Sequence, residues 1–575
     1  MRLTCSHRGF IALLFAFLSC SPRPQSNAFN YVITKNINCT NGAVVSAHAL
    51  ASEAGLHILK SGGNAVDAAI ATQLALAVVY PGAGNIGGGG FMVAHLVNTG
   101  PSKNEPIDVA LDYRETAPAA ASRDMYLDSI GNPKLSLSQN GHLAAGVPGT
   151  IAGLFAAAKY AKLPFKKLIQ PAIDLAANGF IISASEAANL NEEKPEFLRL
   201  NSSPPVFVKN IPWKKGDTLI QIDLANTLKR IRDEGAKGFY EGMTAQLIEE
   251  EMNRGNGIIT KDDLKNYEAK YREPVKFNYD GYTVVTMPMP SSGGILLQQM
   301  LKMADSKNIG EMKYGTSESV QLMTEVERRA YADRAEFMGD RDFVKVPVKT
   351  LVSDPYLEKR MSDYTPGKAG SSTQIQPGKI NPESEETTHL NVIDHFGNAV
   401  SVTTTLNGGY GSRTVVAGAG FLLNNEMDDF SVKPGVPNMY GAVGAEANAV
   451  APGKRMLSSM TPTIVLKNNK PWIVVGTPGG TTIPTSVFQT LVDIIDFNMS
   501  PEDAVNKPKF HHQWLPDEIF AEKTFDPEVL RKLKDMGYTI NTRDAIGRTE
   551  VIIISEDNHI KAVADNRGDD AVAGY

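Results

Sequence analysis

The sequence predicts a globular α+β protein in which helices dominate the middle of the chain and strands dominate the last third. Its 575 residues are 42% hydrophobic and 21% charged, which is enough apolar material for a large buried core. Amphipathic helix patterns recur between residues 150 and 385, for example in SVQLMTEVERRAYADRAEF, and strand patterns such as AVSVTTTL follow. A chain of this length forms three or four structural units or one large composite fold.

The N-terminus has the features of an export signal. A basic segment with Arg2 and Arg8 precedes FIALLFAFLSC, an apolar run that is too short to span a bilayer. A buried helix is the alternative, but the polar SPRPQSNAF that follows favours a signal peptide over residues 1–19. Phe17–Cys20 resembles a loose bacterial lipobox, in which Cys20 carries the lipid. We therefore expect an exported protein that is periplasmic or attached to the envelope, with Cys20 as its lipid anchor.

Charge and cysteine content argue against two other classes of protein. The net charge of −6 disfavours a nucleic-acid partner, because phosphate binding needs a basic face. Three cysteines do not form a disulfide framework, and after removal of Cys5 and lipidation of Cys20 only Cys39 keeps a thiol.

A glycine-rich run near residue 85 suggests a nucleotide site at first sight. The residues Gly82, Gly84 and Gly87 match the spacing of a dinucleotide-binding fingerprint. That fingerprint needs a strand before it and a helix after it, whereas here the Ala-rich helix pattern NAVDAAIATQLALAVV precedes it and the strand pattern FMVAHLV follows. We therefore expect the glycines to serve a tight turn or close backbone packing.

The clearest linker covers residues 355–386, which are polar and rich in Pro, Gly and Ser. A β-hairpin follows, made of HLNVID, a turn at residues 396–398 and AVSVTTTL. Beyond it, TPTIVLK, PWIVVG and VIIISE predict strands, and TSVFQTLVDIID predicts a helix. The last third should therefore be mostly sheet with a few covering helices.

The junction between linker and hairpin reads Glu386-Thr387-Thr388-His389. Cleavage before a threonine frees an α-amine that can accept the proton of its own hydroxyl, so that one residue supplies both nucleophile and base. Taken alone, two threonines at the start of a strand express only β-propensity.

Further motifs place this junction in a family pattern. They comprise Asp112–Glu115, Ala145–Gly149, Pro290–Gly294, Thr387–His389, Thr403–Asn407, Leu423–Phe430, Leu457–Pro462, Thr477–Gly480, Phe510–Pro516 and Ala573–Tyr575. In this order they resemble the γ-glutamyltranspeptidases, which belong to the N-terminal-nucleophile hydrolases. The resemblance implies a four-layer αββα sandwich. It also implies autocleavage between Glu386 and Thr387 into a large subunit, residues 20–386, and a small subunit, residues 387–575, that pair as a heterodimer.

The resemblance also implies a role for each matching residue. Thr387 is the nucleophile, supported by Thr405, and Gly479 and Gly480 offer backbone N–H groups to an oxyanion. The residues implied for substrate binding are Arg114, Ser458 and Ser459 for the α-carboxylate, and Asn407, Glu426 and Asp429 for the α-ammonium. Residues 434–440 resemble the lid loop of the family, with Tyr440 as its gate. Bacterial members often carry glutamine at the position of Glu426, so this glutamate is a departure.

The implied function is that of a γ-glutamyltransferase and glutathione hydrolase. It transfers the γ-glutamyl group of glutathione and related donors to water or to amino-acid and peptide amines, with no cofactor. His389, His511 and His512 show no metal-ligand spacing, so we expect them to be structural. The alternatives are a related acylase or poly-γ-glutamate hydrolase, and a catalytically silent binding protein.

Overall fold

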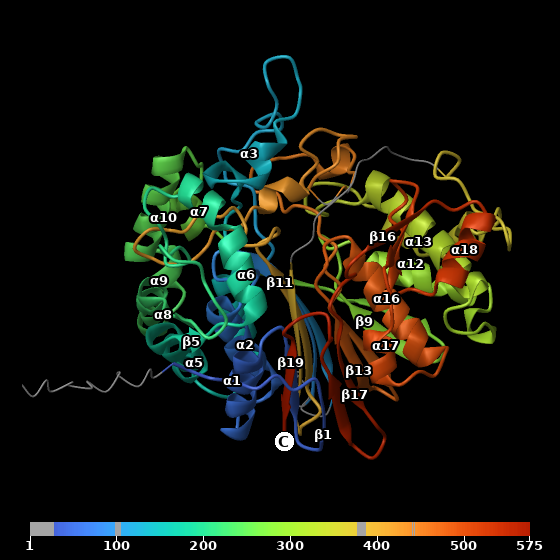
Figure 1. Cartoon of the computed structure of the whole chain (residues 1–575), viewed down its shortest axis with the longest axis horizontal. Coiled ribbons are helices and arrows are strands. Elements are labelled where there is room, and N and C mark those ends of the chain that lie inside the picture. The colour runs from blue at the N-terminus through green and yellow to red at the C-terminus, as the bar shows by residue number, and fades with distance from the viewer. Residues whose placement is uncertain (1–27, 98–104, 376–386, 440, 442) are drawn as a thin grey trace, which may run out of the picture.

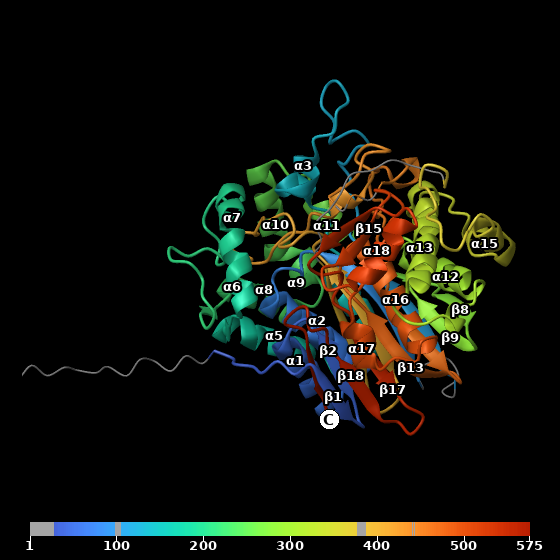
Figure 2. The same ribbon diagram turned by 45° about the vertical axis from the view of Figure 1, so that its right-hand side comes forward.

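The computed structural model describes residues 28–97, 105–375, 387–439, 441 and 443–575. These residues form two seven-stranded antiparallel sheets that are stacked in the middle of the molecule, with helices on both outer sides (Figure 1, Figure 2). The predicted α+β class and the four-layer αββα order are confirmed.

The strand order brings together segments that are far apart in the sequence. The first sheet runs β19 (Ala571–Gly574), β2 (Ala43–Ser46), β10 (Thr388–Ile393), β11 (Ala399–Thr405), β3 (Gly89–Leu96), β4 (Ile107–Asp112) and β7 (Lys270–Arg272). The second runs β1 (Asn36–Cys39), β18 (Ile560–Val563), β17 (Glu550–Ile554), β13 (Lys470–Gly476), β12 (Thr463–Lys467), β9 (Tyr282–Thr286) and β8 (Val275–Tyr279). Both sheets therefore contain strands from before and after the predicted cleavage point.

Three apolar cores separate the four layers. The inner core fills the space between the sheets, where Phe91 and Val93 of β3 belong to the same buried cluster as Val474 of β13 and Ile552 of β17. Alternate residues of each strand point the other way, as the period of two requires. They form one outer core on the first sheet and a second on the other sheet.

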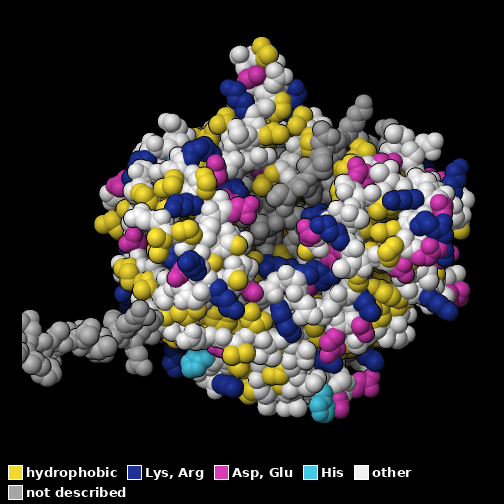
Figure 3. Space-filling view, viewed as in Figure 1, with side chains coloured by type: hydrophobic (Ala, Val, Ile, Leu, Met, Phe, Trp, Pro, Cys, Tyr) yellow, Lys and Arg dark blue, Asp and Glu magenta, His cyan; other side chains and the backbone are white. Residues whose placement is uncertain are grey.

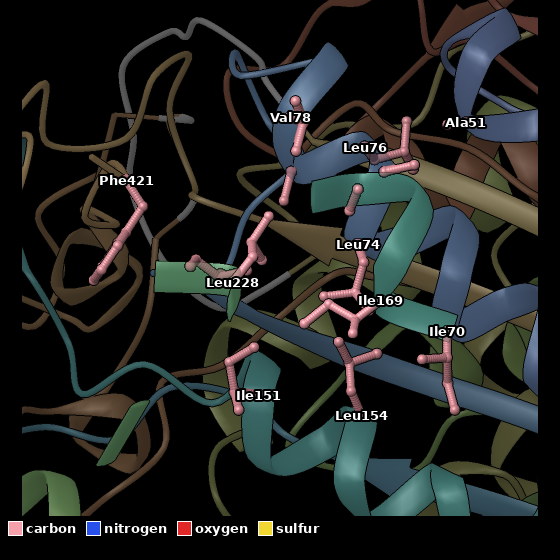
Figure 4. Packing of buried hydrophobic residues seen from close by; sticks show 14 of the residues in the cluster. Ala51, Ile70, Leu74, Leu76, Val78, Ile151, Leu154, Ile169, Leu228 and Phe421 are labelled. Carbon is pink, nitrogen blue, oxygen red and sulfur yellow. The ribbon is translucent and has the colours of Figure 1, made fainter. Parts of the chain in front are cut away.

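The outer helices cover these cores. The first sheet is covered by α1 (Ala49–Lys60), α2 (Ala65–Val79), α5 (Phe165–Asn178) and α8 (Ile222–Glu234), and the second by α12 (Gly293–Asp305), α13 (Ser317–Phe337) and α16 (Thr482–Ile495). Every residue of α2 is buried, because this Ala-rich helix lies under its neighbours; Figure 4 shows Ile70, Leu74 and Leu76 packed among side chains of other helices. Among the described residues, no helix combines the length and the apolar character needed to cross a bilayer.

The remaining helices and strands complete the fold. The helices are α3 (Leu135–Gln139), α4 (Thr150–Ala157), α6 (Ala184–Glu192), α7 (Lys194–Leu200), α9 (Lys237–Tyr240), α10 (Gly242–Gly255), α11 (Lys261–Lys265), α14 (Val348–Leu351), α15 (Asp354–Arg360), α17 (Pro501–Asn506) and α18 (Pro527–Asp535). The strands β5 (Phe180–Ile181) and β6 (Thr218–Leu219) pair, as do β14 (Phe510–His511), β15 (Ile519–Glu522) and β16 (Ile540–Arg543).

Two predictions for the middle of the chain were wrong. The linker was expected from residue 355, but α15 occupies residues 354–360, since Pro355 stands at the start of a helix, where its missing N–H is not needed. The middle region was expected to be a helical layer, but it also contains β7, β8 and β9.

Two other predictions are confirmed: the hairpin of β10 and β11, and the close backbone packing of the glycines between residues 82 and 87. A Cβ on Gly84 or Gly87 would lie 2.1 Å from a backbone oxygen.

Two carboxyl groups lie buried at the edge of the inner core. Glu550 opens β17 and Asp570 immediately precedes β19, and both are fully buried. None of their four carboxyl oxygens has a hydrogen-bond donor from the protein. Burial and the neighbouring Asp570 raise the pKa of Glu550 well above its ordinary value of 4.5.

This burial makes stability fall with increasing pH. Above pH 4.5 the folded state holds the Glu550 proton while the unfolded chain releases it, so the contribution of Glu550 declines as the pH rises toward its folded pKa. We expect Tm of the wild type to fall between pH 5 and 9 and Glu550→Gln to reduce that slope. Calorimetry at several pH values measures this, with the surface substitution Glu556→Gln as the control. Equal slopes in Glu550→Gln and wild type would contradict the assignment.

Candidate active site

Thr387 lies immediately before β10, which is paired on both sides, with β2 and with β11. The residue is 4% exposed and borders a cavity in which segments from both halves of the chain meet. The cavity is lined by Arg114, Arg334, Thr387, Thr405, Asn407, Glu426, Asp429, Asn438, Ser458, Ser459, Met460, Gly480, Thr481 and Ile483. The structure thus brings together all the predicted site residues that it describes, except Gly479, which borders a second cavity that also contains Thr387.

Gly479 and Gly480 form the turn between β13 and α16. Both have positive φ angles, 133° and 51°, a conformation that favours glycine. The carbonyl of Gly479 accepts a hydrogen bond from the N–H of Thr482 at 2.8 Å. Because the C=O and N–H of one peptide plane point in opposite directions, the N–H of Gly480 points away from the helix. This orientation suits an anion at the cavity.

Arg114 follows β4 and is 1% exposed, so it is not a solvated surface residue. Its backbone N–H bonds Asp112 Oδ1 at 3.0 Å, and its carbonyl accepts the hydroxyl of Tyr267 at 2.7 Å. These bonds hold the backbone while the guanidinium reaches into the cavity. There it pairs with Glu426 and with Asp429.

Three carboxyl groups surround this one guanidinium. Glu115 lies 3.7 Å from Arg114 Nη1, and Glu426 and Asp429 bind the guanidinium directly. Burial raises the pKa of Glu426 well above its ordinary value, although Arg114 opposes the shift. Burial likewise raises the pKa of Glu115 to about 7 and raises that of Asp429. The surplus of carboxyl groups means that this part of the cavity can accept an added positive charge by losing a proton.

Hydroxyl and amide groups complete the lining. The backbone N–H of Asn407 donates to Thr405 Oγ1 at 2.7 Å, and the Asn407 side chain donates to Asn425 O at 3.0 Å. Ser459 Oγ accepts a bond of 3.2 Å from Arg334 on α13. Ser458 and Ser459 therefore border the cavity beside a second guanidinium, which can also approach an anion.

Part of the predicted lid loop lies against the cavity. Asn438 Nδ2 donates to Asp429 Oδ1 at 3.1 Å, and the N–H of Met439 donates to Asp428 Oδ2 at 2.7 Å. Tyr440, the predicted gate, lies outside the described residues, as do Glu386 and Cys20.

Sequence reasoning missed Arg334, Thr481 and Ile483, and it gave no role to Asn438 and Met460, which lie within motifs it had found. Arg334 belongs to an ordinary amphipathic helix pattern, so only the tertiary fold brings it to Ser459. The predicted structural histidines are buried and make hydrogen bonds: His389 contacts Thr403 Oγ1 at 2.8 Å and His511 contacts Thr485 Oγ1 at 2.8 Å.

Comparison with known proteins decides the family. The family model for γ-glutamyltranspeptidase matches residues 51–575. The chain belongs to this family. It is 45% identical over 566 residues to a glutathione hydrolase proenzyme of Escherichia coli, covering 97% of this chain and 96% of the relative. It is 44% identical over 505 residues to a protein of the same name from Pseudomonas aeruginosa, covering 87% and 88%.

Solved structures agree with the fold. A γ-glutamyltranspeptidase chain from Helicobacter pylori is 45% identical with a TM-score of 0.55, and the match covers 61% of this chain and 97% of that one. A cephalosporin acylase from Bacillus halodurans has a TM-score of 0.79 at 24% identity and covers 96% and 99%, which shows a shared fold.

The charge cluster around Arg114 predicts a specific stability effect. Arg114→Gln leaves buried carboxyl groups without their guanidinium, and we expect a loss of about 3 kcal/mol, the lower end for a broken buried pair because the carboxyls can take up protons. Adding Glu426→Gln should restore part of that loss. Urea unfolding of the two variants and the wild type measures both effects. A double variant less stable than Arg114→Gln alone would contradict this account.

Proposed function

We propose that this protein is a γ-glutamyltransferase and glutathione hydrolase that matures by cutting itself between Glu386 and Thr387. One observation carries the proposal: Thr387 borders the same cavity as a buried arginine, a group of carboxylates and the N–H of a glycine turn. This combination matches the three parts of a γ-glutamyl donor, which are its α-carboxylate, its α-ammonium and the carbonyl to be attacked.

The reaction needs only groups of this chain. The hydroxyl oxygen of Thr387 adds to the γ-carbonyl while the α-amine of the same residue, free after cleavage, takes the hydroxyl proton. The N–H of Gly480 stabilises the oxyanion. The C–N bond then breaks, the departing amine receives that proton, and a γ-glutamyl ester remains on Thr387. Water or an acceptor amine attacks the ester and restores the hydroxyl.

Donor recognition exchanges charges already present in the cavity. The α-carboxylate of the donor would replace a protein carboxylate at Arg114, whose planar fork suits a bidentate contact. Ser458 and Ser459 would add hydroxyl donors. The α-ammonium would neutralise the displaced Glu426 and Asp429, beside Asn407. An acyl group without these two charges would leave Asp429 and Glu426 buried as they are, which favours the γ-glutamyl reaction over the acylase alternative.

We also propose export and two subunits. Residues 1–19 have the composition of a signal peptide, and Cys20 is the candidate for lipid attachment. The relatives from Escherichia coli and Pseudomonas aeruginosa are named proenzymes, which supports processing at Thr387. Because β10 is hydrogen-bonded on both sides, a cut before Thr387 leaves the sheet intact. The proposed subunits, residues 20–386 and 387–575, would therefore stay together.

Intact mass spectrometry tests the maturation step. The wild type should yield a fragment of residues 387–575, about 20 kDa, with threonine at its N-terminus, because the free amine is the base. Thr387→Ala should stay as one chain and lose turnover of a γ-glutamyl anilide. Thr388→Ala, which alters the adjacent threonine, serves as the control and should still cleave. A fully active Thr387→Ala variant would exclude the proposed nucleophile.

The raised pKa of Glu426 gives donor binding a pH dependence. Burial raises the pKa of Glu426, whereas a bound ammonium favours the ionised carboxylate and so lowers that pKa. We expect KM for the donor to fall as the pH rises from 6 to 8. In Glu426→Gln, KM should be higher and depend less on pH. Initial rates of γ-glutamyl anilide hydrolysis at several pH values measure it, and parallel pH profiles for the two proteins would rule out this role of Glu426.

A further inference from the structure

A second and larger cavity meets Thr387 from the other side. It has a volume of about 550 Å³ and contains Gly479, the partner of Gly480 in the glycine turn. Thr387 thus separates two spaces: the one with Arg114 and Asp429, and this one, which none of the site residues except Thr387 and Gly479 borders. Figure 3 shows a hollow between the two halves of the molecule, with Lys and Arg side chains gathered at its lower edge.

Arg548 is fixed beside the glycine turn on the wall of this second cavity. Its backbone N–H donates to Thr477 Oγ1 at 2.8 Å, and Thr477 lies two residues before Gly479. The preceding Gly547 has a φ of 66°, and a Cβ there would lie 2.7 Å from Thr477 Oγ1, so the two segments pack closely. The guanidinium stacks on Tyr80, 5.2 Å from the ring centre, and its Nη2 donates to the Tyr80 hydroxyl.

Three arginines line the wall of this cavity. Arg567 is held by Glu522 and Asp565, so its charge is balanced within the fold. Arg548 has Asp570 as its neighbour at 3.8 Å, a longer separation, and its side chain is 19% exposed. Arg543 lies on the same wall.

Two carboxylates also line the cavity, and one of them, Asp569, directly follows Gly568, where a Cβ would lie 2.6 Å from Arg548 Nη1. Glu186 accepts the hydroxyl of Tyr410 at 2.9 Å, and Asp569 accepts that of Ser185 at 2.6 Å. Hydrogen bonds from Ser183 and Ser185 help to lower the pKa of Asp569, which therefore carries its negative charge at neutral pH. Three arginines, Arg543, Arg548 and Arg567, thus line the cavity with two carboxylates, and an anionic ligand is attracted toward the arginines.

We propose that the second cavity binds the peptide leaving group of the donor, with the C-terminal carboxylate of that peptide at the guanidinium of Arg548. The inference rests on the proposed function, since it assigns the other half of the same substrate. Thr387 and Arg548 line the same cavity of about 550 Å³, which has room for a dipeptide that extends at most about 7 Å. The substrate class is γ-glutamyl peptides that end in a free carboxylate.

The first test uses the unmodified protein and two substrates that differ only at the peptide end. Glutathione and its C-terminal amide have the same γ-glutamyl group, but the amide carries no negative charge. We expect a KM for hydrolysis about tenfold higher for the amide, the usual effect of losing a charge-assisted bond. Equal KM values would overturn the inference. Turnover of γ-glutamyl anilide, which has no peptide, separates this result from a failure of the proposed function.

The second test assigns the effect to a residue. In Arg548→Gln the KM ratio of amide to acid should fall to about one, while Arg548→Lys should keep part of the preference because the positive charge remains. Arg531→Gln, an exposed arginine on α18, is the control and should keep the wild-type ratio. Mass spectrometry checks that each variant is cleaved. If Arg548→Gln does not mature, the KM ratio of Arg548→Lys serves as the test. An undiminished ratio in either mature Arg548 variant would overturn the role of Arg548.

Discussion

The position of β10 constrains everything else in this molecule. In the proposed mechanism, Thr387 becomes the first residue of a new chain and yet has to keep its position beside the cavity. A strand end is usually free to fray, but β10 is paired on both sides, with β2 from the start of the chain and with β11 from its own hairpin. The proposed cut would therefore free the amine of Thr387 without displacing the residue, because the hydrogen bonds of β10 to its two neighbouring strands do not depend on the bond that is cut.

The second constraint is electrostatic. A guanidinium that is 1% exposed, as Arg114 is, cannot remain without a counter-charge, and the empty site supplies carboxylates in contact with it. A zwitterionic ligand restores the balance when it inserts, since it brings one charge of each sign. A donor with only one of these two charges would leave one partner unmatched. In the proposed mechanism, selectivity for an amino-acid-like donor thus follows from the ion pairs that Arg114 forms with Glu426 and Asp429.

The sequence predicted features that depend on residues close together in the chain, but it did not predict contacts between segments that are far apart. The hairpin and the helix α13 follow from hydrophobic periods, and the close packing of Gly84 follows from the order of helix and strand around it. The site residues were found through motifs whose register no composition or period reveals. Arg334 and Arg548 were missed because their neighbourhoods look like ordinary helix and loop. Only the tertiary fold brings α13 to the segment before β12, and so Arg334 to Ser459, and the segment before β17 to the end of α2, and so Arg548 to Tyr80.

In the proposed mechanism, the two cavities hold the two parts of one donor. The charges that line the cavity with Arg114 would hold the γ-glutamyl group through both halves of the reaction, so the ester would not need to move. The cavity with Arg548 must be emptied of the first amine before water or a second amine can attack. An acceptor peptide has the same groups as the departing one, an amine near Thr387 and a carboxylate further along. The same cavity therefore suits both, and a departing peptide competes directly with the acceptor that replaces it.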